Sequence, residues 1–282
     1  MPSAIVTHCG AGSTRELQDL SRDAGAAGMA VLRSRGGALD AVLVAVVALE
    51  DDPRTNAGTG SRMRVDGRIQ MDAAIMDSSL QVGSVAAIRR VRNPIFVARA
   101  VMDTPHILLV GEDATRFAHR CGFPAFNPAT VRSRARLQES LKDLRKGRVP
   151  AWARKWKGFA WDTVGAVARD SRGRFAAGSS TGGHAFMMPG RVGDSPLVGC
   201  GLYAGPSGAV TVTGIGEEIA RVVLSKFVYD RLDDGDRAQA ACDAGLALFR
   251  KSVPVGLIAV DRRGVAESCN RNMAWWASEK SR

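Results

Sequence analysis

A threonine opens a strand-like segment in the stretch Trp161-Asp162-Thr163-Val164-Gly165. A threonine hydroxyl is a useful nucleophile only beside a base, and a free α-amine on the same residue can be that base. The unperturbed pKa of an α-amine, about 7.7–8.0, is near working pH and therefore suits general-base catalysis. Because Thr163 lies in mid-chain, its nitrogen belongs to a peptide bond. A catalytic role therefore requires cleavage between Asp162 and Thr163; otherwise Thr163 is an ordinary strand residue.

Three glycine-rich motifs follow and supply hydroxyl and charged groups: Gly178-Ser179-Ser180-Thr181-Gly182-Gly183, Gly190-Arg191-Val192-Gly193-Asp194-Ser195-Pro196 and Thr213-Gly214-Ile215-Gly216-Glu217. Thr181 follows the next strand-like segment, so a hairpin would return it to Thr163; its alternative role is to cap a turn. Thr213 and Gly214 precede a helix whose first N–H groups can stabilise a developing oxyanion. An ordinary strand-to-helix turn is the alternative there.

Arg191 and Asp194 are three residues apart in a loop rich in glycine and proline. A guanidinium can grip a carboxylate with two parallel hydrogen bonds, and a carboxylate accepts hydrogen bonds from an ammonium group. Together the two side chains would hold both ends of an amino acid's backbone. A local salt bridge between them is the alternative interpretation.

The composition bounds the class of protein. The chain has 282 residues, of which 45% are hydrophobic, so it can form a sizeable globular core. It contains no apolar run of about 18 residues, and its start lacks the pattern of a signal peptide. The five cysteines are scattered and odd in number, which indicates reduced thiols in a cytoplasm. They are Cys9, Cys121, Cys200, Cys242 and Cys269.

The formal net charge is +11, and most of the excess lies in one stretch. Between residues 132 and 157, Glu139 and Asp143 are outnumbered by ten basic residues: Arg132, Arg134, Arg136, Lys142, Arg145, Lys146, Arg148, Arg154, Lys155 and Lys157. A solvated linker over about residues 127–160 is one interpretation. Electrostatic attraction of an acidic partner is the other.

Apolar periodicity and turn residues predict the remaining elements. We expect helices over residues 22–33, 38–50, 94–102, 114–121, 217–229 and 238–248. We expect strands over residues 5–6, 82–88, 107–110, 164–170, 175–179, 197–203, 209–213, 255–261 and 265–269, and a hairpin over 63–71. Hairpins outnumber strict β-α-β alternation, which favours an α+β fold with antiparallel sheets and helices on their outer faces.

The motifs also carry a resemblance that spans nearly the whole chain. The sequence resembles the plant-type (type 2) L-asparaginase and isoaspartyl peptidase family of N-terminal nucleophile hydrolases. Besides the four motifs above, the resemblance rests on His8-Cys9-Gly10-Ala11-Gly12, Asn56-Ala57-Gly58-Thr59-Gly60-Ser61, Met71-Asp72-Ala73-Ala74-Ile75-Met76-Asp77 and Asn93-Pro94-Ile95. Cys9 and Thr55 depart from the family pattern, which usually has a glycine and an aromatic residue at these positions. A left-handed backbone at Cys9 would be strained.

This resemblance implies a four-layer αββα sandwich in a single domain, made as an inactive precursor. Autoproteolysis at Asp162–Thr163 would give an α chain of residues 1–162 and a β chain of residues 163–282, assembled as a dimer of αβ heterodimers. Thr163 would then attack L-asparagine or a β-aspartyl dipeptide and release L-aspartate. The implied partners are a small-molecule substrate and a second copy of the protein, without a membrane or nucleic acid.

The resemblance also assigns roles to particular residues. The implied catalytic residues are Thr163, Thr181, Thr213, Gly214 and Asn56, and the implied substrate-binding residues are Arg191, Asp194, Gly214 and Gly216. No cofactor is required. A structural sodium ion would be held by the backbone carbonyls of Leu49, Glu50, Asp52, Thr55, Ala57 and Thr59, since oxygen ligands suit a hard cation.

Two alternative functions remain open. One keeps the fold and changes the substrate, as in glycosylasparaginase or the threonine aspartase that cleaves proteins. The other is a degenerate, unprocessed member of the family that binds nucleic acid or another anion through the basic stretch. Persistence of the intact chain and salt-sensitive binding would mark the second alternative.

Overall fold

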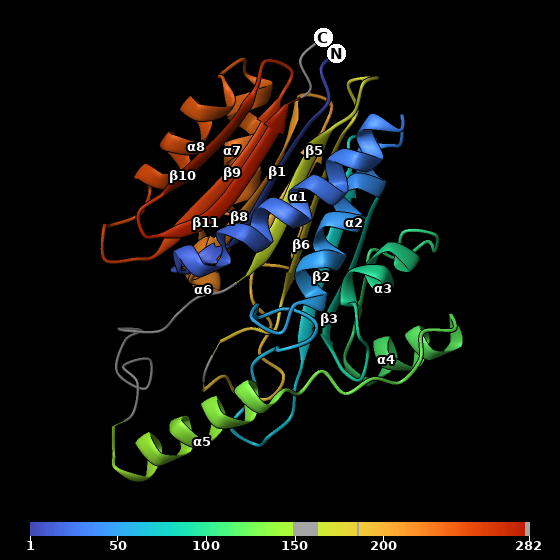
Figure 1. Ribbon diagram of the computed structural model, residues 1–282. Coiled ribbons are helices and arrows are strands. Elements are labelled where there is room, and N and C mark those ends of the chain that lie inside the picture. The colour runs from blue at the N-terminus through green and yellow to red at the C-terminus, as the bar shows by residue number, and fades with distance from the viewer. Residues whose placement is uncertain (149–162, 185, 280–282) are drawn as a thin grey trace.

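Two β-sheets lie face to face at the centre of the computed structural model, which describes residues 1–148, 163–184 and 186–279 (Figure 1). The larger sheet has the strand order β11-β1-β5-β6-β2-β3-β4, and the smaller has the order β10-β9-β8-β7. The strands of the larger sheet are β1 (Ala4–Ala11), β2 (Met71–Asp77), β3 (Val82–Ile88), β4 (Leu108–Val110), β5 (Val164–Arg169), β6 (Phe175–Thr181) and β11 (Met273–Glu279). Those of the smaller are β7 (Leu202–Gly205), β8 (Gly208–Gly214), β9 (Val255–Asp261) and β10 (Val265–Cys269).

Helices cover the outer face of each sheet. On the larger sheet, α1 packs on β1 and β11, α2 on β5 and β6, and α3 and α4 on β3; on the smaller sheet, α7 and α8 pack on β8, β9 and β10. The helices, with one 3₁₀ turn at Arg15–Leu17, are α1 (Gln18–Arg33), α2 (Ala38–Asp51), α3 (Pro94–Val101), α4 (Gly111–Arg120), α5 (Val131–Arg145), α6 (Gly216–Arg221), α7 (Leu224–Asp233) and α8 (Ala238–Ala247). The predicted four-layer αββα sandwich is therefore confirmed.

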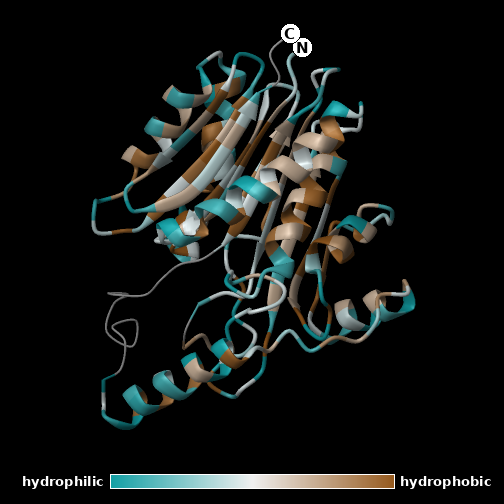
Figure 2. Ribbon diagram, viewed as in Figure 1, coloured by the Kyte–Doolittle hydropathy of each residue, from teal (hydrophilic) through white to brown (hydrophobic). Residues whose placement is uncertain are grey.

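Three apolar clusters hold these layers together. One lies between α1 to α4 and the larger sheet, one between the two sheets, and one between the smaller sheet and α7 and α8. Strands β1, β5 and β6 are buried along their whole length, because each is covered on both faces. Figure 2 shows α2, which covers this sheet, largely in brown and tan. Burial on two faces explains why these strands lack a regular alternation of buried apolar and exposed polar residues: even their polar residues, such as His8, Arg169 and Ser179, are buried.

The pairing of strands is antiparallel throughout both sheets except between β3 and β4. This agrees with the antiparallel-rich fold expected from the sequence. Sheet contacts between β5 or β6 and β8 bring the start of β5 close to the end of β8. That edge of the sandwich is where the functional motifs converge.

Some boundaries differ from the sequence-based expectation. Strand β1 covers Ala4–Ala11, whereas a strand was expected over residues 5–6 alone. The segment expected as a hairpin contains only a single bridge, between Met63 and Ile69, and the strands β2 and β11 were not predicted. The helix expected over residues 217–229 is two helices, α6 and α7, because Val223 adopts a left-handed φ of 50°.

The expected linker contains a helix. Helix α5 occupies residues 131–145, and Thr130 and Ser133 form a reciprocal capping box at its start. Capping satisfies N–H groups that the first turn leaves without acceptors, so a strongly charged sequence can still begin a helix here. Residues 149–160 of the expected linker lie outside the described residues.

Within the described ranges, no helix is both long and apolar enough to span a membrane.

Candidate active site

Thr163 immediately precedes β5 and is buried, with 7% of its surface exposed. The antiparallel register pairs Val164 with Ser180, so Thr163 lies opposite Thr181 at the end of β6. The hairpin expected to return Thr181 to Thr163 is therefore present. Asp162 lies outside the described residues.

A small pocket opens at this edge of the sandwich. It gathers most of the residues singled out in the sequence from four separate segments of the chain. Its lining consists of Thr163, Thr181, Gly183, His184, Arg191, Asp194, Ser195, Gly214 and Gly216. Thr213 and Asn56 are near this edge but do not line the pocket.

Asn56 holds the turn that follows Thr181. Its backbone carbonyl accepts a hydrogen bond from Gly182 N at 2.6 Å, and its Nδ2 donates to the carbonyl of Gly183. Its Oδ1 accepts from Arg62 N at 2.9 Å. Asn56 therefore positions the wall of the pocket from the loop that follows α2.

Thr213 and Gly214 end β8 beside the pocket. The Thr213 hydroxyl oxygen accepts a hydrogen bond from Ala11 N at 3.1 Å, so its hydrogen remains available to a further acceptor. Gly214 has a φ of 148°, and an added Cβ would collide with the carbonyl of Pro254. Glycine is therefore required where β8 turns into α6.

Asp194 carries a buried oxygen that lacks a partner. The residue is 4% exposed, and its Oδ2 accepts no hydrogen bond from any described residue. Burial raises the pKa of this carboxyl to about 7, and the positive charge of Arg191 offsets part of that rise. A buried acceptor without a donor is costly, so the site favours a ligand that donates here, as an ammonium group does.

Arg191 is held by a carboxylate that the sequence analysis did not single out. Its Nε donates to Glu217 Oε1 and its Nη2 to Glu217 Oε2, each at 2.8 Å. Gly216 makes this approach possible, because an added Cβ would lie 2.9 Å from Arg191 Nη2 and 2.7 Å from Asp194 Oδ1. An acidic residue in the first turn of a helix usually complements the helix dipole, so Glu217 gave no separate signal in the sequence.

A buried arginine supports the loop that carries Arg191. Arg64 Nη2 donates to the carbonyls of Gln70 and Arg191, at 3.3 and 3.2 Å. Gln70 Oε1 accepts from Gly190 N at 2.8 Å. Burial lowers the pKa of Arg64 to about 10, so it stays charged at neutral pH. Arg64 had no recognisable motif around it and was also missed.

The six carbonyl oxygens expected to bind sodium belong to the last turn of α2 and to the loop that follows it, up to Thr59. The hydroxyl of Thr55 lies among three of them, at 2.8 Å from Leu49 O, 3.1 Å from Asp52 O and 3.4 Å from Ala57 O. The carbonyl of Glu50 accepts from Thr59 N at 2.8 Å. This arrangement does not fit a cation at the centre of the loop unless Thr55 moves.

Cys9 lies in β1 and is buried, with its Sγ 3.7 Å from Leu17 O. It does not belong to the non-glycine residues with positive φ, so the strain considered for this position is absent.

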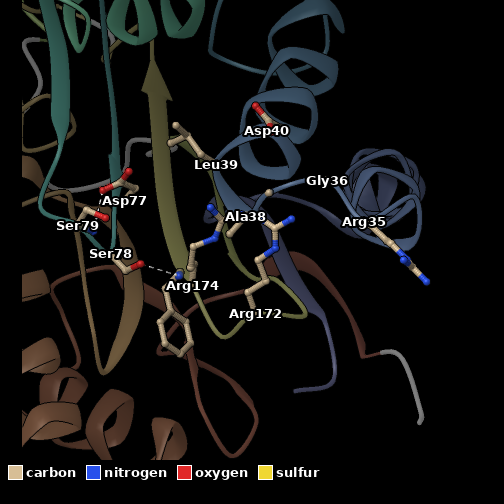
Figure 3. Close-up of a pocket in the computed structure, with 12 residues that line it drawn as sticks. Arg35, Gly36, Ala38, Leu39, Asp40, Asp77, Ser78, Ser79, Arg172 and Arg174 are labelled. Carbon is tan, nitrogen blue, oxygen red and sulfur yellow. Dashed lines mark hydrogen bonds between the residues drawn. The ribbon is translucent and has the colours of Figure 1, made fainter.

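A larger cavity, of about 420 Å³, lies at the other end of β5 (Figure 3). It is bounded by the start of α2, the β2–β3 turn and the β5–β6 turn. In Figure 3 the side chains of Arg172 and Arg174 run side by side toward the start of α2, whereas Arg35 points away. At about 3.3 Å per residue, the length of β5 separates this cavity from Thr163 by about 20 Å. Its lining contains no residue of the motifs that follow Thr163.

The sandwich, with this pocket at the edge shared by its two sheets, has the architecture of the N-terminal nucleophile class of hydrolases. Residues 2–282 match a protein family described as Asparaginase. A plant-type L-asparaginase of Pyrococcus abyssi is 43% identical over 278 residues, covering 93% of this chain and 90% of the relative.

Two further relatives are isoaspartyl peptidase/L-asparaginases. That of Danio rerio is 37% identical over 294 residues and covers 100% of this chain and 94% of its own length. That of Homo sapiens is 41% identical over 262 residues, with 89% and 83% covered. The chain therefore belongs to the asparaginase family and is a hydrolase, which confirms the resemblance found in the motifs.

Proposed function

We propose that this protein cleaves itself before Thr163 and then hydrolyses β-aspartyl dipeptides and L-asparagine, releasing L-aspartate. The observation that carries this proposal is the pocket in which Thr163, Arg191 and Asp194 come together. The names of the relatives, plant-type L-asparaginase and isoaspartyl peptidase/L-asparaginase, support the same substrates.

In the maturation step, the Thr163 hydroxyl attacks the carbonyl carbon of Asp162. The peptide C–N bond breaks as the acyl group passes from nitrogen to oxygen, and the nitrogen takes up the hydroxyl proton. Water then hydrolyses the ester, which leaves a carboxylate on Asp162 and a free α-amine on Thr163. That amine is placed to act as the base for its own hydroxyl.

In the substrate reaction, Arg191 pairs with the α-carboxylate and Asp194 accepts from the α-ammonium group. The hydroxyl of Thr163 attacks the side-chain carbonyl of the substrate, and Thr213 and Gly214 stabilise the oxyanion. Ammonia or an amino acid leaves first, carrying the proton taken up by the amine. Water then releases L-aspartate and restores the hydroxyl.

The proposal is tested by intact mass and N-terminal sequencing of the purified protein, together with the Thr163→Ala variant. We expect two fragments, the smaller starting at Thr163, and one uncleaved, inactive chain for the variant. Arg172→Ala, in the distant cavity, is the control and should be cleaved and active. Turnover by a preparation of full-length mass would refute the proposal.

A substrate comparison separates the proposed activity from that of a glycosylasparaginase. The measurement is kcat/KM for L-asparagine, for β-aspartyl dipeptides and for a glycosylated asparagine. A larger kcat/KM for the glycosylated substrate would assign the chain to that alternative. An acidic protein as substrate tests the threonine aspartase alternative in the same way. Persistence of the intact chain with salt-sensitive anion binding would support the degenerate, unprocessed member.

We also propose that the cleaved protein forms a dimer of αβ heterodimers in the cytoplasm. All five cysteines are free thiols, which supports a reducing compartment. Sedimentation of the mature protein tests the assembly. The sodium ion stays an untested prediction of the resemblance; the position of the Thr55 hydroxyl argues against it, and no step of the proposed reaction depends on it.

A further inference from the structure

The Arg191 guanidinium and the Glu217 carboxylate form a paired unit at the wall of the pocket. Both hydrogen bonds are 2.8 Å long and involve Nε and Nη2, so the carboxylate occupies the side-on edge of the guanidinium. The side chains are 15% and 32% exposed. Partial burial makes a charge-assisted pair of this geometry stronger and better fixed than one at the surface.

This pairing leaves the other edge of the guanidinium for a ligand. An arginine has five N–H donors in a rigid planar fork, and the bonds to Glu217 use one from Nε and one from Nη2. The end-on edge, formed by Nη1 and Nη2, keeps two parallel donors. Among the described residues, the one hydrogen-bond contact of Nη1 is with the sulfur of Met187, at 3.5 Å.

Glycines leave room around this group. A Cβ on Gly193 would lie 2.7 Å from Arg191 Nη1 and 3.3 Å from Nη2. A Cβ on Gly216 would lie 2.9 Å from Arg191 Nη2 and 2.7 Å from Asp194 Oδ1. Glu217 therefore fixes the guanidinium along one edge. Around the rest of the guanidinium, Gly193 and Gly216 bring the backbone close without adding a side chain.

We propose that Glu217 is a positioning residue that orients Arg191 so that its end-on edge faces the α-carboxylate of the substrate. This inference rests on the proposed function and deepens it, because it names the residue that makes a free α-carboxylate a requirement. A long side chain has many rotamers, and holding it in one before the substrate arrives reduces the entropy lost on binding. Glu217 itself does not touch the substrate.

The competing interpretation is that Glu217 obstructs the site. In that case its carboxylate would have to leave Arg191 before the substrate could bind, and removing it would tighten binding. The two interpretations predict opposite changes in KM, which makes them separable by experiment.

The test is the steady-state kinetics of Glu217→Gln with L-asparagine and with L-asparaginamide, which has the same scissile amide but no α-carboxylate. Loss of a charge-assisted pair should raise KM for L-asparagine about tenfold to a hundredfold, with kcat changed less than about threefold. KM for L-asparaginamide should change less than about threefold. Glu217→Asp, which keeps the charge, should fall between wild type and Glu217→Gln.

Glu218→Gln is the matched control, since Glu218 is the next residue of α6 and pairs with Arg221 on the surface. It should behave as wild type with both substrates. Thermal unfolding and the extent of self-cleavage are measured for each variant. If Glu217→Gln fails to fold, the comparison of Glu217→Asp with wild type decides in its place.

A lower KM for L-asparagine in Glu217→Gln would overturn the inference and support obstruction. An equal loss with both substrates, or a loss confined to kcat, would also overturn it. A wild-type protein that hydrolyses neither substrate would instead refute the proposed function, so the two failures are distinguishable.

Discussion

The two ends of β5 carry cavities of opposite character. The end at Arg172 and Arg174 has the larger cavity, with exposed arginines around it. The end at Thr163 has a small pocket, but most of its polar groups are buried, and one oxygen of Asp194 has no hydrogen-bond partner among the described residues. A buried polar group without a hydrogen-bond partner is therefore a better indicator of an active site than the volume of a cavity.

The strongest test of this difference is to remove one carboxylate at each end of β5. We expect Asp194→Asn to lower kcat/KM for L-asparagine about a hundredfold or more, because the substrate ammonium then meets a neutral amide. Asp77→Asn at the other cavity should change kcat/KM less than about twofold. Steady-state assays of both variants, with a check of self-cleavage, make the measurement. Equal losses would show that the two ends do not differ as argued.

The pH dependence of activity tests the same buried carboxyl. Because burial raises the pKa of Asp194 to about 7, the ionised form that binds an ammonium group dominates only above that pH. Protonation of the Thr163 amine lowers kcat and kcat/KM alike, so we expect kcat/KM to fall about tenfold more than kcat for each pH unit below 7, since kcat/KM also reports Asp194 in the free enzyme. Bound substrate favours the ionised form, so kcat should not show this titration. A kcat/KM profile that runs parallel to the kcat profile between pH 5 and about 8 would contradict the assignment.

Glu50 provides a buried carboxyl that differs from Asp194 in lying away from the pocket. Its Oε1 accepts from Ser180 Oγ at 2.6 Å and Ile95 N at 3.1 Å, and burial raises its pKa to about 8. The native fold therefore favours the protonated form. Its contribution to stability is complete below about pH 4.5 and is lost as pH rises to about 8.

We expect the free energy of unfolding of Glu50→Gln to increase relative to that of wild type as pH rises, because the variant has no carboxyl to ionise. The difference in free energy of unfolding should grow by up to about 1.4 kcal/mol per pH unit in that window. Denaturant titrations at several pH values make the measurement. Glu112→Gln, which removes an exposed carboxylate paired with Arg90, is the control. A difference independent of pH would show that Glu50 is not held protonated.

The smallest expected effect concerns sodium and the loop that carries Asn56. We expect wild-type Tm to differ by less than about 1 °C between sodium chloride and choline chloride. Thr55→Val should lower Tm by about 2–4 °C, because Leu49 O loses a donor worth about 1 kcal/mol. Thr55→Ser, which keeps the hydroxyl, should stay near wild type. A rise of more than about 5 °C in sodium would show that a cation binds despite Thr55.

Local patterns predicted those parts of the site in which neighbours along the chain are also neighbours in space. Thr163 and Thr181 belong to one hairpin, and Arg191 and Asp194 belong to one loop, so spacing was informative. Glu217 and Arg64 meet Arg191 only through the stacking of distant segments. No sequence period reports such contacts, so these residues could not be found from spacing.

The missed strands have a related cause. Strand β11 pairs with β1, and β2 pairs on one side with β6, so each has a partner from a distant part of the chain. The Asp66-Gly67 turn signal suggested a hairpin that ends at Met71. Instead, β2 begins at Met71, forms a hairpin with β3 through a later turn, and pairs on its other side with β6. Strand β11 contains the half-exposed Trp275 and Trp276 and lacks strict alternation, so no pattern marked it.

The strand order of the larger sheet bears on the two fragments that the proposed cleavage before Thr163 would produce. Strand β1, from the first fragment, is hydrogen-bonded on one side to β11 and on the other to β5, both from the second. Strand β6 of the second fragment is likewise bonded to β2 of the first. The halves are interleaved within one sheet, so separating them would require unfolding both. The proposed cleavage would thus free a new terminus while the paired strands still hold both fragments together.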